Sequence, residues 1–388
     1  MKALLLGLCA CVAALVLGVA LIAFGIWLRL APPPGHWTLT VASPLGELRV
    51  SVPKLLQAAT DPSLARWLDG RRLPSPIGAL ALRWEVATAT LTARCAPCVL
   101  RVSALGDEPV VLREATLSLR RAGEGRYDGA LSSGDVVLPF AASATATSLS
   151  LRGQLPATPM AALFALLGDA VPETQRAQID GTFAARVSLQ LPQRRWTIEP
   201  AVEGFEVRGL ATEALAHAHV PAQCAPVPRG RVSPWLERAV IAAEDQRFAE
   251  HAGYDLAELR DAIEGNQRRD HAARGASTIT QQLARLVYTG DARSLARKAR
   301  ELLYAVEMER TLGKGRILRL YLAIAPWGDG LCGAESAARL YFDKGAAALD
   351  PREAAWLAVR LRAPSASTDA VTSERIAPVL TSLRVPRP

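Results

Sequence analysis

The stretch AVIAAEDQRFAEHAG, Ala239–Gly253, decides the fold of the region that contains the chemistry. A helix signal precedes it, because Ser233 suits an N-cap and Pro234 suits the first helical position. Apolar residues recur at i, i+3, i+4 and i+7, which predicts an inward face made of Leu236, Ala239, Val240 and Ala243. Glu244 follows at the rim of that face, where a carboxylate can have a raised pKa and act as a general base. The alternative is a solvated acidic pair at an exposed helix end.

The composition limits the class of protein. The chain has 388 residues, which suggests two or three domains, and 50% of them are hydrophobic, enough for sizeable cores. The formal net charge is +8, and most of the cationic side chains are arginines. Guanidinium groups favour phosphates and anionic membrane surfaces as partners. A basic chain also suits nucleic acid, but the amino terminus argues against that partner.

The amino terminus predicts a membrane anchor. Residues Ala3–Leu28 form one apolar run without a charge, and a bilayer crossing takes about 20 such residues. The run is longer than the core of a signal peptide, which has about 7–15 residues, and bulky Phe24, Ile26 and Trp27 fill its end. We therefore predict a transmembrane anchor in residues 1–30 that crosses the membrane once. Its amino end is expected in the cytoplasm and the remaining chain outside it.

The region from 36 to 209 predicts a β-rich domain. Apolar and polar residues alternate there with a period of two, which is typical of half-buried strands in an antiparallel sheet. The apolar positions of this pattern include Leu80, Leu82, Trp84, Leu117, Leu119, Leu149, Leu151, Val187 and Leu189. The region shows no catalytic constellation, so we interpret it as a structural or partner-binding domain.

The cysteines predict a disulfide and no metal site. Cys95 and Cys98 form a C-x2-C pair, whereas Cys224 and Cys332 stand alone in the sequence. A zinc site needs two further ligands at suitable spacing, and the sequence shows no matching pair. Outside the cytoplasm, a local disulfide between Cys95 and Cys98 is favoured over a metal site.

The region from 221 to 363 is predicted to be helical, and it contains a second polar motif, RGASTITQQLARLVY at Arg274–Tyr288. Gly275 gives the backbone freedom there. Ser277 or Thr278 caps a new helix, whose free N–H groups suit a phosphate. Polar residues follow at i, i+4 and i+8 on one face of this helix, namely Ser277, Gln281 and Arg285. The alternative is an ordinary amphipathic helix.

The next predicted helix, Arg293–Arg310, combines a carboxylate with cations. One of its faces bears Arg293, Arg297 and Glu301, with Lys298 beside them. One interpretation is a surface helix with a weak i, i+4 ion pair between Arg297 and Glu301. The other is a carboxylate set among cations that bind a diphosphate.

Four motifs, in this order and spacing, resemble those of the peptidoglycan glycosyltransferase family, which includes the glycosyltransferase domains of bifunctional penicillin-binding proteins. They are EDQRFAEHAG (Glu244–Gly253), GASTITQQ (Gly275–Gln282), RKARE (Arg297–Glu301) and ILRLYL (Ile317–Leu322). A later segment, Trp327–Phe342, is similar to the monofunctional biosynthetic transglycosylases. The resemblance covers roughly Val232–Ala363, and no S-x-x-K motif of a transpeptidase domain follows it.

The resemblance implies a mainly α, lysozyme-like fold and the polymerisation of lipid II into glycan strands. Glu244 matches the family's catalytic base, which deprotonates the 4-hydroxyl of the acceptor sugar. That oxygen attacks the anomeric carbon of the donor, with inversion and release of polyprenyl diphosphate. Glu301 matches the second catalytic glutamate, which positions the diphosphate directly or through a divalent cation such as Mg²⁺ or Mn²⁺. No other cofactor is expected.

Further motif residues match the family's substrate-binding positions. Lys298, Arg297 and Arg293 match the basic residues at the donor phosphates, and Arg285 stands where the family usually has lysine. The other predicted substrate-binding residues are Asp245, Arg247, Phe248, His251, Gly275, Ser277, Thr278, Gln281 and Gln282. The family motif YLN reads Tyr321-Leu322-Ala323 here, so the asparagine is replaced.

We therefore predict a multidomain protein: a transmembrane anchor (1–30), a β-rich antiparallel domain (36–209), a mainly α lysozyme-like glycosyltransferase domain (221–363) and a tail (364–388). It is placed in the inner membrane, with the catalytic domain on the periplasmic side. The expected partners are lipid II, the growing glycan strand, the membrane and, through the β-rich domain, cell-wall synthesis proteins. Two alternatives stay open: a degenerate protein that binds lipid II or glycan, and a lysozyme-like hydrolase. The presence of Glu244 argues against the first, and the basic motif argues against the second.

Overall fold

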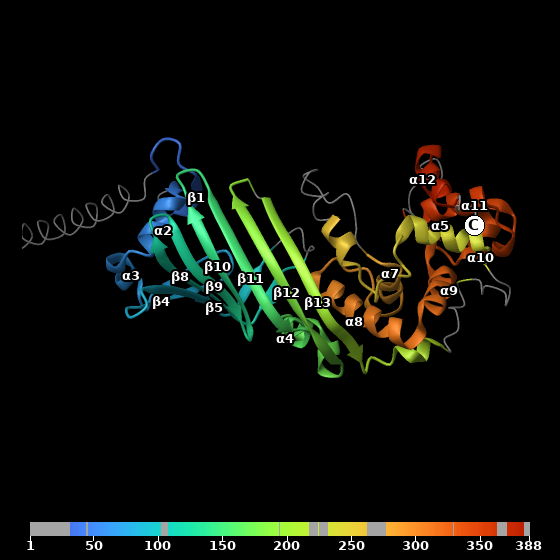
Figure 1. Ribbon diagram of the computed structural model, residues 1–388, viewed down its shortest axis with the longest axis horizontal. Helices are drawn as coiled ribbons and strands as arrows, with labels where there is room; N and C mark the ends of the chain where they lie inside the picture. The colour runs from blue at the N-terminus through green and yellow to red at the C-terminus, as the bar shows by residue number, and fades with distance from the viewer. Residues whose placement is uncertain are drawn as a thin grey trace, which may run out of the picture. The chain divides into compact units, whose positions relative to one another are not determined.

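The computed structural model describes residues 32–43, 46–101, 108–193, 195–216, 224, 232–261, 277–328, 330–362 and 371–383. The chain divides into two compact units (Figure 1). The sheet unit comprises Met1–Cys98, Leu112–Pro156 and Ala184–Glu199, and the helical unit comprises Val99–Val111, Ala157–Phe183 and Pro200–Pro388. Residues 157–183, which lie inside the range predicted for the β-rich domain, thus belong to the helical unit by their contacts.

A nine-stranded sheet forms the β-rich part, in the order β13-β12-β11-β10-β9-β8-β5-β4-β3 (Figure 1). Neighbouring strands from β3 to β11 pair antiparallel, as the alternation predicts. The strands are β3 (Arg72–Leu73), β4 (Leu80–Glu85), β5 (Thr90–Cys95), β8 (Ala115–Gly123), β9 (Arg126–Ser133), β10 (Val136–Ala144), β11 (Leu149–Pro159), β12 (Gln178–Leu191) and β13 (Arg195–Arg208).

The register of the strands explains the period-two pattern. Trp84 lies opposite Leu91, and Leu91 lies opposite Leu119, so these side chains share one face. The neighbouring row on the other face is polar and consists of Arg83, Thr92 and Ser118. Ala65 packs on Trp84 and Leu91 and forms a small core with them.

Two short helices and a strand pair complete the β-rich part: β1 (Thr38–Ser43), β2 (Gly46–Ser51), α2 (Val52–Ala59) and α3 (Pro62–Leu68). A further pair, β6 (Cys98–Leu100) and β7 (Val110–Leu112), lies mostly in the segment 99–111, which belongs to the helical unit. The side chains of Ser51 and Asp61 accept backbone N–H groups at the starts of α2 and α3. A proline within the first two helical positions follows each cap. Cap and proline together define where each helix begins.

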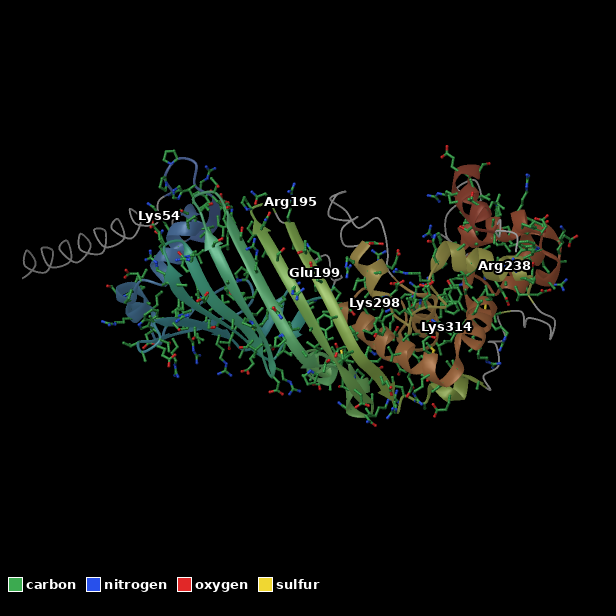
Figure 2. All side chains as sticks on the ribbon, viewed as in Figure 1. Lys54, Arg195, Glu199, Arg238, Lys298 and Lys314 are labelled. Atoms are coloured by element: carbon green, nitrogen blue, oxygen red, sulfur yellow. A yellow bond between two sulfur atoms is a disulfide. The ribbon has the colours of Figure 1, made fainter. Side chains whose placement is uncertain are left out.

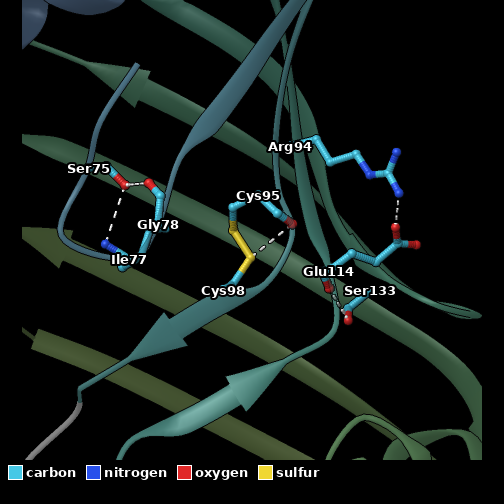
Figure 3. The surroundings of a disulfide bond; sticks show 8 residues. All are labelled: Ser75, Ile77, Gly78, Arg94, Cys95, Cys98, Glu114 and Ser133. Atoms are coloured by element: carbon cyan, nitrogen blue, oxygen red, sulfur yellow. Dashed lines mark hydrogen bonds and ion pairs between the residues drawn. A yellow bond between two sulfur atoms is a disulfide. The ribbon is translucent and has the colours of Figure 1, made fainter. Parts of the chain in front are cut away.

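A disulfide joins Cys95 at the end of β5 to Cys98 at the start of β6, which confirms the predicted pair (Figure 3). Both cysteines are buried. In the surrounding chain, Ser133 Oγ donates a hydrogen bond to the Glu114 carbonyl at 2.6 Å, and the Glu114 carboxylate pairs with Arg94 (Figure 3).

The helical unit contains α4 (Met160–Ala165), η2 (Gly168–Ala170), η3 (Pro172–Gln175), η4 (Thr212–Ala216), α5 (Pro234–Glu244), α7 (Ile279–Ala284), η5 (Arg285–Thr289), α8 (Leu295–Leu312), α9 (Lys314–Ile324), β14 (Pro326–Gly328), β15 (Leu331–Cys332), α10 (Ala334–Phe342), η6 (Ala346–Ala348), α11 (Pro351–Leu361) and α12 (Ser373–Leu383). Its core includes fully buried Leu236, Ile279, Leu283, Leu303, Ile317 and Leu357. The inward face predicted for α5 is confirmed, because its four apolar residues are all buried.

A second disulfide, Cys224–Cys332, joins two cysteines that stand alone in the sequence and are 108 positions apart. Cys332 lies in β15, shortly before α10. No local spacing signals a pair so distant in sequence, so only the fold brings the two cysteines together.

The transmembrane helix predicted as part of the fold requires a correction. Among the described residues, no helix is both long enough and apolar enough to span a bilayer. The run predicted to do so, Ala3–Leu28, lies outside the described residues.

The long-range disulfide is expected to contribute much more stability than the local one. Replacing both members of the Cys224–Cys332 pair by serine frees a loop of 108 positions, which is expected to cost about 5 kcal/mol of unfolding free energy through unfolded-state entropy. Serine variants of the Cys95–Cys98 pair, only 3 positions apart, are the control. Denaturant unfolding of the two double variants tests the difference, and equal losses would contradict it.

Candidate active site

Glu244 is the last residue of α5, and its carboxylate is buried, with 12% of the side chain exposed. Its Oε2 accepts a hydrogen bond from Gln282 Nε2 at 2.9 Å. Its Oε1 is buried without a hydrogen-bond partner among the described residues, and Arg362 Nε lies 3.5 Å from it. Desolvation by burial raises the pKa of Glu244, although Gln282, Arg362 and Arg285 each lower it. A buried carboxylate with one oxygen that accepts no hydrogen bond is suited to accept a proton.

Gln282 is held in place from both ends. Tyr321 Oη donates a hydrogen bond to Gln282 Oε1 at 2.7 Å, and Tyr321 is only 1% exposed. Because the phenol occupies the carbonyl end of the amide, the NH₂ end of Gln282 faces Glu244. Tyr321 therefore orients the group that donates to the carboxylate, without contacting Glu244 through any hydrogen bond of its own.

The start of α7 explains how Gln282 reaches this place. The Thr278 side chain accepts the Gln281 N–H at 3.1 Å, and Gln281 Oε1 accepts the Thr278 N–H at 3.1 Å, which makes a capping box. Thr278 Oγ1 also donates to the Gly253 carbonyl at 2.8 Å. Two predicted substrate-binding residues, Thr278 and Gln281, thus build the helix start, and Gln282 follows on it.

The loop after α5 is held by the charged residues of its motif. Asp245 accepts hydrogen bonds from His251 Nε2 at 2.9 Å and from the Ile279 N–H at 2.9 Å, so it ties the end of α5 to the first turn of α7. Arg247 forms an ion pair with Asp255 through two nitrogens. Phe248 is buried in the core, and Lys314 Nζ lies 4.4 Å from the centre of its ring.

The second carboxylate, Glu301, lies on α8 with 2% of its side chain exposed. Arg297 pairs with one of its oxygens, and Lys298 Nζ lies 2.9 Å from the other. Lys298, which lies on α8 (Figure 2), also donates to Ser277 Oγ at 2.7 Å. Burial lowers the pKa of Lys298 to about 7, with smaller contributions from the neighbouring Arg297 and Arg285. Both Glu301 oxygens are engaged by cations, which makes this residue a fixed charge.

Arg285 acts electrostatically on both Glu244 and the cation cluster beside Glu301. It lies in η5, directly after α7, and its charge acts on both Glu244 and Lys298. The structure thus brings Glu244, Gln282, Arg285 and the Lys298 cluster together within the helical unit. Of the other predicted residues, Arg293 is exposed just before α8, and Gly275 lies outside the described residues.

Two residues around Glu244 escaped the sequence analysis. Tyr321 was noted only as part of a motif, and nothing local signals that its hydroxyl reaches Gln282. Arg362 follows α11, more than a hundred positions after the carboxylate that it approaches. The Thr278–Gln281 capping box, in contrast, has a readable sequence signature, T-x-x-Q.

The donor set around Glu301 does not fit a divalent cation. Mg²⁺ and Mn²⁺ prefer several oxygen ligands, whereas both oxygens of this carboxylate face Arg297 and Lys298. The residues that the structure describes include no group of three or more His, Cys, Asp or Glu that could hold a metal ion. The predicted cation stays a prediction, and no step below is routed through a metal.

Known proteins resemble part of this chain. A family model described as transglycosylase matches residues 212–383. The chain is 38% identical over 190 residues to the biosynthetic peptidoglycan transglycosylase of Thiobacillus denitrificans. This match covers 47% of this chain and 82% of that protein. It is 47% and 46% identical over 138 residues to the proteins of that name from Aromatoleum aromaticum and Shigella boydii. These matches cover 36% of this chain and 60% and 57% of those proteins.

The chain therefore belongs to the peptidoglycan glycosyltransferase family, as its motifs predict. This membership also confirms the predicted enzyme class, a peptidoglycan glycosyltransferase. The match of the family model begins at residue 212, after the last strand of the nine-stranded sheet.

Removing the Tyr321 hydroxyl is expected to disturb Glu244 through Gln282. In Tyr321→Phe, Gln282 is no longer fixed, so the hydrogen bond that lowers the pKa of Glu244 weakens and the acidic limb of the rate profile moves to higher pH. A lost hydrogen bond of about 1 kcal/mol corresponds to about fivefold in rate. Rate against pH measures both effects, with Tyr254→Phe as the control, since that hydroxyl has no described hydrogen bond. An unchanged acidic limb would refute the orienting role.

The ionised Glu244 is expected to lower the stability of the fold. Its pKa in the fold is raised above 4.5, so Glu244→Gln should unfold at a higher temperature than the wild type at pH 7. The difference is full above the folded-state pKa and disappears below about 4.5, where both states bind the proton. Glu301→Gln, which loses a paired charge, should be destabilised instead. Thermal unfolding at several pH values measures this, and a less stable Glu244→Gln at pH 7 would contradict it.

Proposed function

We propose that this protein polymerises lipid II into glycan strands and releases polyprenyl diphosphate. The observation that carries the proposal is the pairing of a buried carboxylate, one oxygen of which accepts no hydrogen bond, with a second carboxylate that orders cations. The first suits a proton acceptor, and the second suits a site for a diphosphate leaving group. Membership of the family supports the same reaction.

In the proposed reaction, Glu244 accepts the proton of the 4-hydroxyl of the acceptor sugar. The hydroxyl oxygen forms a bond to the anomeric carbon of the donor, and the bond from that carbon to the diphosphate oxygen breaks on the opposite face. The configuration at the anomeric carbon is therefore inverted. Because burial raises the pKa of Glu244, it is a stronger base than an exposed glutamate.

The leaving diphosphate needs cations more than it needs a strong acid. Lys298, Arg297 and Arg285 supply them, and Arg293 stands exposed just before α8. Glu301 holds Arg297 and Lys298 in place before the substrate arrives. The fixed arrangement stabilises negative charge that develops on the diphosphate oxygen.

We propose that the site works in the cell envelope, outside the cytoplasm. The relatives are named as peptidoglycan transglycosylases, and the two disulfides of this chain suit an oxidising compartment. The polyprenyl substrate places the reaction at a membrane surface. The nine-stranded sheet is proposed to contact cell-wall synthesis proteins.

The proposal is tested by incubating the protein with labelled lipid II and separating the products on a gel. Polymer together with released polyprenyl diphosphate supports transfer. Shortening of added glycan without release of that diphosphate would identify a hydrolase. Binding of lipid II without any product would identify a degenerate binding protein.

The two carboxylates are expected to fail in different ways. Glu244→Gln keeps the shape and the Gln282 contact but loses the proton acceptor, so turnover should fall by about 10²-fold or more, with binding of a diphosphate-containing donor analogue unchanged. Glu301→Gln should weaken binding of that analogue, because Arg297 and Lys298 lose their partner. Turnover and analogue binding are measured for both variants. Near-normal polymerisation by folded Glu244→Gln would contradict the role of Glu244 as the general base.

A further inference from the structure

A short turn before the family match lies against the cationic helix of the site. The turn is η3, Pro172–Gln175, whereas the match begins at residue 212. Glu173 in this turn is 3% exposed, and its Oε1 and Oε2 accept hydrogen bonds from Arg300 Nε at 2.8 and 3.0 Å. Arg300 lies on α8 directly before Glu301, at a position of the RKARE motif that the site itself does not use.

A second contact links the same segment to the element that bears Arg285. Arg176, at the end of η3, donates a hydrogen bond to Tyr304 Oη at 3.0 Å. The Tyr304 ring stacks on the Tyr288 ring, with centroids 4.0 Å apart and planes 3° from parallel. Tyr288 belongs to η5, the short π-helix that begins with Arg285. Glu173 and Arg176 therefore hold α8 and, through the stacked tyrosine rings, η5, which are the two elements that supply the cations.

The segment is itself firmly anchored in the helical unit. Val171, directly before η3, is fully buried and belongs to the same core cluster as Phe164, Phe205 and Leu303. Further along α8, Glu307 accepts the Leu210 N–H at 2.9 Å and the Thr212 N–H at 3.2 Å. The chain before the matched region thus contacts α8 over several turns.

These contacts reach the site because α8 is one helix. Arg300, Tyr304 and Glu307 recur at i, i+4 and i+7 on the face that the preceding segment contacts, while Lys298 and Glu301 belong to the catalytic cluster. A helix moves as a rigid body over such a short distance, so a shift on one face moves the other. A displacement of about 1 Å of a positioning group is enough to slow catalysis strongly.

We propose that Glu173 and Arg176 are positioning residues for the diphosphate site. They hold α8 and η5 so that Lys298 and Arg285 face the donor. The catalytic unit of this protein then includes residues 157–183 in addition to the part that matches the family. The inference rests on the proposed function, because it concerns the donor diphosphate of that reaction.

Glu173→Gln tests the inference, with Glu335→Gln as the matched control. Glu335 is also a buried glutamate of the helical unit that pairs with an arginine, Arg339, but it lies on α10. Each variant is characterised by its KM and kcat for lipid II, by the alkaline limb of its rate profile and by its melting temperature. The Kd of an unreactive glycosyl polyprenyl diphosphate analogue is measured as well. Glu173→Asp keeps the charge on a shorter side chain and takes the place of Glu173→Gln should that variant not fold.

Glu173→Gln is expected to raise KM and the analogue Kd by about fivefold or more and to lower kcat as well, because the same cations bind the diphosphate and stabilise it as it leaves. Its alkaline limb should move to higher pH, because a loosened α8 lets water reach the buried Lys298. Glu335→Gln should lower the melting temperature alone.

The positioning role would be overturned if Glu173→Gln had the KM, the Kd and the alkaline limb of the wild type and lost about as much melting temperature as Glu335→Gln. Glu173 and Arg300 would then form a structural ion pair only. Absence of polymer from the wild-type enzyme would overturn the proposed function instead, so the two failures are distinguishable.

Discussion

The helical unit depends on the contact between the end of α5 and the first turn of α7. Asp245 makes that contact, because its buried carboxylate accepts both the Ile279 N–H and the His251 imidazole. An N–H at a helix start has no partner within its own helix, so a carboxylate there satisfies a donor that would otherwise be lost. With these two ends joined, Glu244 and Gln282 come within hydrogen-bond distance, and the catalytic geometry follows.

The two buried carboxylates of the site differ in how far their negative charge is compensated by neighbouring groups. Glu301 is fully buried and fully paired, so its charge is stabilised by Arg297 and Lys298. Glu244 is buried with one hydrogen bond and only a longer contact to the exposed Arg362, so desolvation dominates and its pKa is raised. The fold thus keeps a costly charge at Glu244, where a base is useful, and a compensated charge at Glu301, where a fixed charge is useful.

The sequence was most informative where the pattern is local. The cap at Ser233, the buried face of α5 and the alternation of the strands all follow from spacings of a few residues, and the structure has them. Long-range pairs such as Cys224–Cys332 and Tyr321–Gln282 could not be predicted, because only the fold sets their distance. For the same reason, the sequence placed residues 157–183 in the β-rich domain and could not assign them to the helical unit.

The most direct test of the account is the titration of the Glu244 carboxyl in the folded protein. Carbon-13 NMR of labelled glutamate side chains, assigned by comparison with Glu244→Gln, gives its pKa. The account predicts a value above 4.5, because desolvation outweighs the contributions of Gln282 and the nearby arginines. A value at or below 4.5 would show a solvated or fully paired carboxylate and would contradict the role of Glu244 as a buried general base.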